Sequence, residues 1–156
     1  MRHPGRGRLT AADVACWVLK TSRAPSELVP GWAAGTTRTL TRCVRRSYRL
    51  DLMAPGQPCL LWLSGRHRPG VYALGVLAGG PGADDAPGAG EGPVVSVQLT
   101  LLSEPVARAD LVADPVARQA EVLRMPAGSN PSWLSAGQFA AVLARAGSPG
   151  LGTWRP

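Results

Sequence analysis

Two apolar segments joined by a short basic turn constrain the fold of this chain most. Residues 59–63 read CLLWL, residues 70–78 read GVYALGVLA, and residues 64–69 between them read SGRHRP. Strands that are apolar on both faces are typical of the centre of a covered or closed sheet. Glycine and proline in the connection are typical of a turn. The pattern therefore predicts a central β-hairpin whose turn exposes Arg66 and Arg68.

The segments around this hairpin predict an α+β fold. Residues 15–20 have the composition of a short buried strand, and residues 94–102 alternate apolar and polar side chains, as a half-buried strand does. Residues 37–44 fit either a strand or a short helix. A capping box precedes an amphipathic helix at 135–146. Because the strands come before the helices, we expect a strongly curved sheet or barrel flanked by short helices. Shorter helical segments are expected at 47–52, 107–114 and 115–123.

Length and composition predict one folded domain between two tails. The chain of 156 residues is long enough for a single core, which is expected to span residues 13–147. Residues 1–12 are rich in glycine and arginine and are expected to be disordered. Residues 148–156 are expected to form a tail. Residues 79–93, GGPGADDAPGAGEGP, can bury almost nothing and are expected to form a flexible loop.

The sequence favours a cytoplasmic protein without membrane segments. No apolar run approaches 18 residues, and the N-terminus lacks the apolar stretch of a secretory signal. The three cysteines, Cys16, Cys43 and Cys59, lack the C-x-x-C spacing that is common in metal and redox sites. They are interpreted as buried thiols in a reducing compartment.

Positive charge is concentrated in the first half of the chain. Residues 1–70 hold eleven Arg and one Lys against three acidic residues, a net charge of +9, whereas residues 71–156 carry −2. A GC-rich genome would explain the preference for Arg over Lys, but not its clustering in one half. The asymmetry therefore favours a polyanionic partner for the first half.

The sequence offers little for catalysis or metal binding. His67, on the hairpin turn, is the only plausible catalytic imidazole, since His3 lies in the N-terminal tail. No nucleophile elbow, Walker loop or H-E-x-x-H motif is present. The cysteines lie on separate segments, which disfavours a metal site. We therefore expect a binding protein without metal or cofactor rather than an enzyme.

Aromatic residues beside arginines point to nucleic acid as the polyanion. Tyr48 lies within residues 45–49, which read RRSYR. Trp17 and Trp62 lie on expected strands, where either core packing or stacking on a base would account for them. A solvated basic patch is the simpler interpretation of residues 45–49 taken alone.

Five segments, in this order, resemble the EVE domain, a PUA-like fold related to the YTH readers of methylated adenine. They are WVLKT at 17–21, RRSYR at 45–49, PGQPCLLWLSG at 55–65, GVYALGVL at 70–77 and LRMPAGSNPSWLSAGQF at 123–139. The resemblance spans residues 15–146. It implies a curved PUA-like β-barrel flanked by helices, with a pocket for a nucleobase, modified or not, flipped out of DNA or RNA.

The resemblance also implies where a base and its phosphates bind. Side chains of the base pocket are expected at Trp17, Lys20, Thr21, Ser47, Tyr48, Trp62, Ser64 and Asn130. Basic residues nearby are expected to contact phosphates, namely Arg42, Arg45, Arg46, Arg49, Arg66 and Arg68. Many EVE domains carry Trp where this chain has Arg42, and residues 79–93 contain no aromatic residue. The aromatic cage of methyl-base readers is therefore expected to be incomplete.

Two functions of different classes fit these observations. The first is a nucleic-acid reader, which predicts a positive surface around a deep pocket. The second is a PUA-like module without base recognition that binds a small ligand or another protein. That module predicts a filled pocket and an exposed apolar patch.

Overall fold

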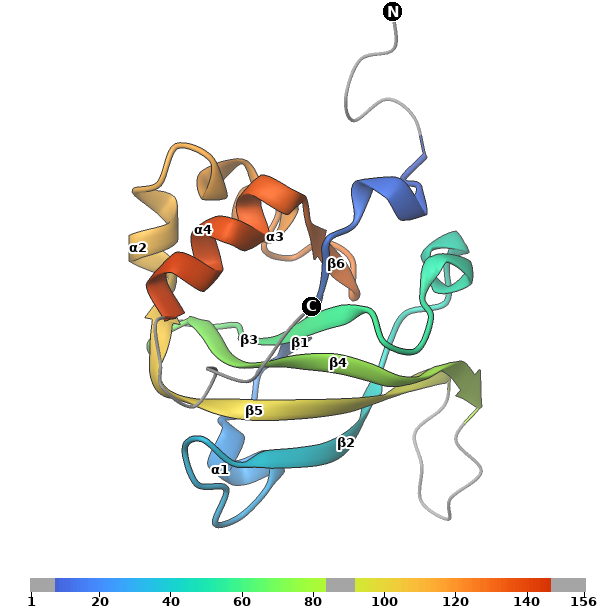
Figure 1. Cartoon of the computed structure of the whole chain (residues 1–156), viewed down its shortest axis with the longest axis horizontal. Coiled ribbons are helices and arrows are strands. Elements are labelled where there is room, and N and C mark those ends of the chain that lie inside the picture. Colours follow the sequence, from blue (N-terminus) through green and yellow to red (C-terminus); the bar gives the residue numbers. More distant parts are fainter. Residues whose placement is uncertain (1–7, 84–91, 147–156) are drawn as a thin grey trace, which may run out of the picture.

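Six strands form one mixed and strongly curled sheet. The structure is a computed structural model, and it describes residues 8–83 and 92–146. The strand order is β2-β5-β4-β3-β1-β6. The strands are β1 Cys16–Thr21, β2 Thr37–Cys43, β3 Pro58–Leu63, β4 Gly70–Ala83, β5 Pro93–Ala107 and β6 Ser132–Leu134. β1 and β3 run parallel, and the other paired strands are antiparallel. The sheet does not close into a barrel (Figure 1), so the expected α+β fold with a curved sheet is confirmed.

Short helices cover one face of this sheet. The α-helices are α1 Pro25–Leu28, α2 Arg108–Val112, α3 Glu121–Arg124 and α4 Ala136–Ala146. The 3-10 turns are η1 Ala11–Asp13, η2 Tyr48–Leu52 and η3 Ala117–Gln119. α2, α3 and α4 lie together on one side of β3 and β4, whereas α1 lies beside β2 on the other side (Figure 1).

The predicted central hairpin is present. β3 and β4 pair from Pro58 opposite Val76 to Leu63 opposite Gly70. Gly70 has a positive φ of 155°, and a Cβ there would overlap the carbonyl oxygen of Val106 on β5. This position therefore requires glycine. The arginines of the turn, Arg66 and Arg68, are exposed as expected.

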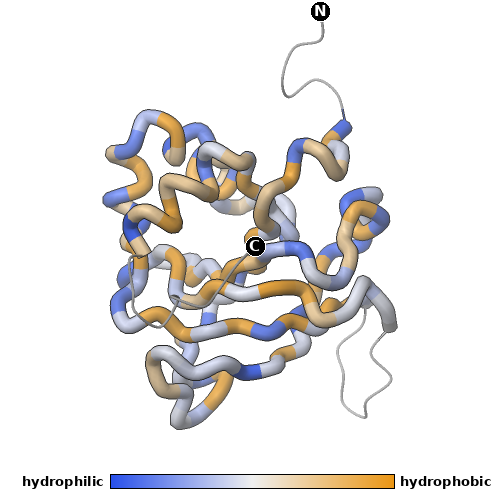
Figure 2. The backbone as a smooth tube through the Cα atoms, in the orientation of Figure 1, coloured by the Kyte–Doolittle hydropathy of each residue, from blue (hydrophilic) through white to orange (hydrophobic). Residues whose placement is uncertain are grey.

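The sheet separates two apolar cores. Along β1 successive side chains point to opposite faces, so Val18 faces the helices and Trp17 faces away from them. We call these the helix-side core, which includes Cys16, Val18, Leu60, Trp62, Phe139 and Val142, and the opposite core, which includes Trp17, Leu19, Leu61, Leu77, Val97 and Leu99. Figure 2 shows hydrophobic segments along the strands and on the helices that face them.

The predicted alternation and capping box are both found. Val95, Val97 and Leu99 of β5 are fully buried, whereas Gln98 between them is exposed. At the start of α4 the Ser135 N–H donates to Gln138 Oε1 and the Gln138 N–H donates to Ser135 Oγ, at 2.9 and 3.3 Å. Residues 37–44, which fitted two alternatives, form strand β2.

Several boundaries differ from the sequence prediction. Strand β4 continues to Ala83, because its last residues pair with β5, so residues 79–83 are not part of a flexible loop. The predicted helix over 115–123 is divided into η3 and α3, because Ala120 has an extended backbone with φ −61° and ψ 142°. The remainder of the expected loop, residues 84–91, lies outside the described residues, as does the tail after residue 146.

The N-terminal segment and one cysteine also differ from expectation. Residues 11–13 form η1, and the Leu9 N–H donates to the Tyr48 hydroxyl at 2.8 Å, so the expected disorder up to residue 12 is wrong for this part. Cys16 and Cys59 are buried, whereas Cys43 is exposed because β2 is an edge strand and Cys43 points outward. None of the helices described in residues 8–83 and 92–146 is long and apolar enough to cross a membrane.

Candidate nucleic-acid interface

Asn130 joins two distant strand ends. It lies in the loop between α3 and β6, where its Oδ1 accepts from the Lys20 N–H of β1 at 3.1 Å. Its Nδ2 donates to the Cys43 carbonyl at the end of β2 at 3.3 Å, and its own carbonyl accepts from the Arg45 N–H at 2.7 Å. β1 and β2 are separated by three other strands in the sheet. Asn130 therefore links the ends of β1 and β2, which do not pair directly, and so stabilises the curvature of the sheet at this corner.

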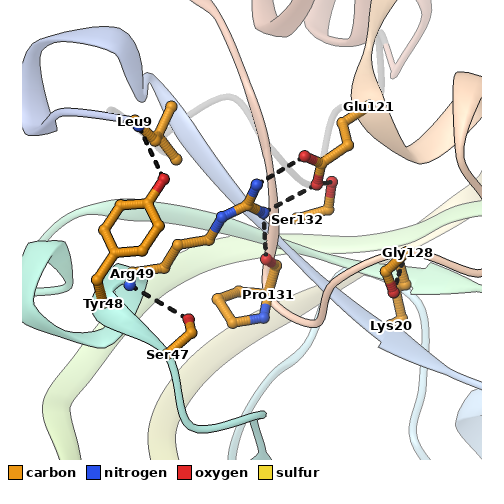
Figure 3. A network of polar contacts seen from close by, with 9 residues as sticks. All are labelled: Leu9, Lys20, Ser47, Tyr48, Arg49, Glu121, Gly128, Pro131 and Ser132. Atoms are coloured by element: carbon orange, nitrogen blue, oxygen red, sulfur yellow. Dashed lines mark hydrogen bonds and ion pairs between the residues drawn. The ribbon is translucent and has the colours of Figure 1, made fainter. Parts of the chain in front are cut away.

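The same loop is held by the side chain of Lys20. Its Nζ donates to the carbonyl of Pro126 at 3.3 Å and to that of Gly128 at 3.2 Å. Figure 3 shows the contact between Lys20 and Gly128. Burial lowers the pKa of Lys20, and the positive charge of Arg49 lowers it further, whereas Glu121 acts in the opposite direction. Two of the three ammonium protons are used in the loop.

Arg49 forms the most extensive polar network of this region (Figure 3). Its guanidinium donates to both carboxylate oxygens of Glu121, at 2.8 and 2.7 Å, and to the Pro131 carbonyl at 3.0 Å. The Ser132 hydroxyl donates to the same carboxylate at 2.8 Å. Burial alone would raise the pKa of Glu121, but the bonds from Arg49 and Ser132 outweigh it, so the pKa lies below the usual value. Arg49, expected to contact phosphate, is thus engaged by an acidic residue of the protein.

Ser47 and Tyr48 also have partners within the protein. The Ser47 hydroxyl accepts from the Arg49 N–H at 3.2 Å and caps η2. The Tyr48 hydroxyl accepts from Leu9, and the guanidinium of Arg8 lies 4.4 Å from the centre of the Tyr48 ring. One face of this ring is therefore covered by a cation–π contact.

The two tryptophans expected in a base pocket lie on opposite faces of the sheet. Trp17 is fully buried in the opposite core and its Nε1 donates to Gln57 at 2.8 Å, whereas Trp62 is 3% exposed in the helix-side core. The parallel register places Trp62 beside Lys20 rather than beside Trp17. The expectation that both rings line one base pocket is therefore wrong.

The space beside Trp62 is too small for a base. An apolar cavity of about 10 Å³ lies between the sheet and α2–α4, with Val18, Leu60, Trp62 and Val142 in its wall. That volume is enough for about one water molecule, whereas ligand pockets are usually several hundred Å³. The helix-side core is therefore packed and has no room for a base.

Thr21 and Ser64 connect the corner to the hairpin. The Ser64 N–H donates to the Thr21 carbonyl at 2.8 Å, which extends the pairing of β1 with β3 into the turn. The Thr21 hydroxyl is buried and accepts from the Arg23 N–H at 3.0 Å. Both residues thus shape the backbone at the end of β1, and their expected role in a base pocket stays a prediction.

The cationic side chains near this corner have few acidic partners. Arg45 and Arg46 are exposed, and Arg42 is half-buried. Arg23 forms a 3.7 Å ion pair with Glu27, with more than half of each side chain exposed. We define the cationic corner as Lys20, Arg23, Arg42, Arg45 and Arg46 around Asn130. Arg23 and Glu121 were not among the predicted site residues, because their places depend on contacts between distant segments.

The residue types in this region do not suggest a metal centre. Among residues 8–83 and 92–146, no group of three or more His, Cys, Asp or Glu side chains is placed to hold a metal ion.

Known structures share this architecture. A hypothetical protein from Leishmania major superposes with a TM-score of 0.65 at 18% identity, covering 87% of this chain and 96% of that one. The DUF55 domain of human thymocyte nuclear protein 1 gives 0.63 at 17% identity, covering 84% and 98%. Human THYN1 in complex with 5-methylcytosine-containing DNA gives 0.57 at 17% identity, covering 85% and 98%. This chain has the EVE-type fold. The resemblance found in the sequence is thus confirmed at the level of the fold.

The other comparisons add no closer relative. No protein-family model matches the chain, and no curated protein matches it. The EVE-type fold is therefore established by structure at low sequence identity. The roles of individual site residues stay predictions.

Proposed function

We propose that this EVE-type domain binds DNA or RNA at the cationic corner. The observation that carries the proposal is the gathering of five basic residues where β1 and β2 are joined by Asn130. Within the part of the chain that the structure describes, the one ion pair of these residues is that of Arg23 with Glu27. A like-charged cluster on a folded surface favours a polyanionic ligand. The complex of human THYN1, which has the same fold, with 5-methylcytosine-containing DNA supports the same ligand class.

In this proposal exposed arginines contact the phosphates, and more recessed side chains contact the base. Arg45 and Arg46 are exposed, so they can reach phosphates without being buried themselves. The hairpin arginines, Arg66 and Arg68, are exposed on the turn that follows Ser64 and supply a second rim beyond Thr21. Phosphate contacts position a strand, whereas groups recessed between the rims read the base. In this proposal a base, modified or not, is taken out of its stack and placed against the corner.

Salt dependence of binding tests the proposal. Binding of a fluorescent oligonucleotide is measured by anisotropy between 50 and 300 mM NaCl (about the range over which phosphate contacts change affinity most), with single-stranded and duplex DNA and with RNA. Arg45 and Arg46 are replaced together by Ala. If each contacts one phosphate, the slope of log K against log salt for duplex DNA falls by about 0.9 per contact.

A control variant that loses the same number of positive charges distinguishes binding at the cationic corner from a general effect of net charge. Arg38 at the start of β2 and Arg118 in η3 are also exposed, and their double Ala variant loses two positive charges outside the corner. The proposal expects this control to retain most of the wild-type slope. Equal losses in the two double variants, or no binding by the wild-type protein, would refute it.

A further inference from the structure

Arg42 is a half-buried basic side chain whose hydrogen-bond donors are not satisfied by the described residues. It lies on β2 opposite Val95 of β5, two residues after Leu40, which packs against the opposite core. Side chains two residues apart on a strand share a face. Arg42 therefore projects to the inner side of the curled sheet, whereas Arg45 and Arg46 after the strand are exposed.

The guanidinium of Arg42 forms no hydrogen bond with the residues that the structure describes. Its Nε is buried and makes no hydrogen bond, and within residues 8–83 and 92–146 the side chain forms neither a hydrogen bond nor an ion pair. The nearby positive charge of Arg23 is unfavourable. Burial lowers the pKa of Arg42, and Arg23 acts in the same direction, whereas Cys43 acts in the opposite direction. An arginine keeps its proton in proteins, so Arg42 remains a half-buried cation that no acidic side chain of the described residues pairs with.

We propose that Arg42 binds the paired acceptor edge of a guanine base, O6 and N7, in the nucleic acid held at the cationic corner. With Nε covered, the two terminal amino groups are the donors left for a ligand, and they form a planar fork. The guanine edge is the base edge that arginine most often contacts with two bonds. This inference rests on the proposed function and specifies the ligand of the same site.

A phosphate group would offer similar acceptors, but the position of Arg42 favours a base. Exposed arginines next to it, Arg45 and Arg46, are better placed for the strand backbone. Arg42 is recessed beside the apolar Leu40, where a flat base can pack and a fully hydrated phosphate loses water. Binding of Arg42 to a base would make affinity depend on the nucleotide sequence, whereas binding to a phosphate would not. This difference can be measured.

The test uses oligothymidylate strands with one central nucleotide changed. Guanine and hypoxanthine both present O6 and N7, 7-deazaguanine lacks N7, and adenine carries an amino group in place of O6. We expect strands with guanine and hypoxanthine to bind alike, and those with 7-deazaguanine and adenine to bind about tenfold more weakly, as expected when a two-bond arginine contact is lost. Arg42→Met should abolish this discrimination, and Arg42→Lys should weaken it because lysine lacks the fork.

Arg38→Met is the matched control, because it removes the same charge from the same strand at an exposed position. It should keep the preference for guanine. Thermal melting of Arg42→Met gives a second measurement that does not depend on binding. Because Arg42 has no hydrogen-bonding or ion-pair partner among the described residues, the melting temperature should equal or exceed that of the wild type.

The outcomes separate this inference from the proposed function. If the wild-type protein binds no strand, both fail. If it binds all strands equally, only the inference about Arg42 fails. If Arg42→Met weakens every strand equally and flattens the salt dependence, Arg42 is a phosphate contact and the inference is overturned. A marked drop in melting temperature would also contradict it, because Arg42 would then have a partner within the protein.

Discussion

Removing one partner of the ion pair between Arg49 and Glu121 should destabilise the fold more than removing the interaction alone would, because the other charge stays buried. The two side chains are 13% and 19% exposed, and they link η2 to α3 across 72 residues of sequence. Removal of one partner from a buried pair costs about 3–5 kcal/mol, because the other charge stays buried. The slight exposure places this pair at the lower end of that range.

The structure gives different magnitudes for the two single variants. Glu121→Met leaves Arg49 with only the Pro131 carbonyl and the nearby Tyr48, neither of which carries a full negative charge, and leaves the Ser132 hydroxyl without its acceptor. We therefore expect a loss of about 3 kcal/mol. Arg49→Met leaves the carboxylate with the Ser132 hydroxyl and the nearby positive charge of Lys20, so we expect about 2 kcal/mol. The double variant has no uncompensated charge. Its loss should be about 2 kcal/mol rather than the sum of about 5, a coupling of about 3 kcal/mol.

Urea unfolding followed by tryptophan fluorescence measures these free energies. The exposed pair Arg23–Glu27 is the control, with side chains 64% and 59% exposed, and its coupling in the same Met series should stay below about 1 kcal/mol. If the losses at Arg49 and Glu121 simply add, the two groups do not interact in solution and the network described here is refuted.

The same pair predicts a dependence of stability on pH. The pKa of Glu121 is lower in the folded protein than its usual value of 4.5. A lowered carboxyl pKa contributes stability that is present above the unfolded pKa and is lost as pH falls through the folded value. The difference in unfolding free energy between wild type and Glu121→Met should therefore be constant from pH 7 to about 5 and shrink at lower pH. A difference that stays constant down to pH 3 would contradict the lowered pKa.

Two further substitutions test the geometry of the sheet. Gly75→Ala should destabilise the domain by about 3 kcal/mol or more, because the added Cβ would overlap the Gln98 carbonyl of the neighbouring strand; a melting temperature close to wild type would show that β4 and β5 are further apart than described. Asn130→Ala removes one bond to β1 and one to β2 and should cost about 2 kcal/mol in urea unfolding. A loss near zero would mean that Asn130 does not hold the corner.

Local sequence patterns were sufficient for the elements that depend on near neighbours. The capping box at Ser135 and Gln138 spans three residues, and the alternation from Val95 to Leu99 reflects the period of a strand. Both are properties of a short segment, so the sequence predicted them correctly. The resemblance to EVE domains predicted the overall fold, because five motifs in the right order outweigh the weakness of each one.

Contacts between distant segments decided the functional geometry. The sequence placed Trp17 and Trp62 in one pocket, but the parallel register of β1 on β3 puts them on opposite faces of the sheet. Arg49 was predicted to contact phosphate, and its pairing with Glu121 depends on how α3 packs against η2. Side-chain period identifies which residues share a face of one strand, but not which strand lies next to it. The sequence therefore determined the strands and the positive charge of the first half, and the tertiary structure decided which of the described basic side chains pair with an acidic residue.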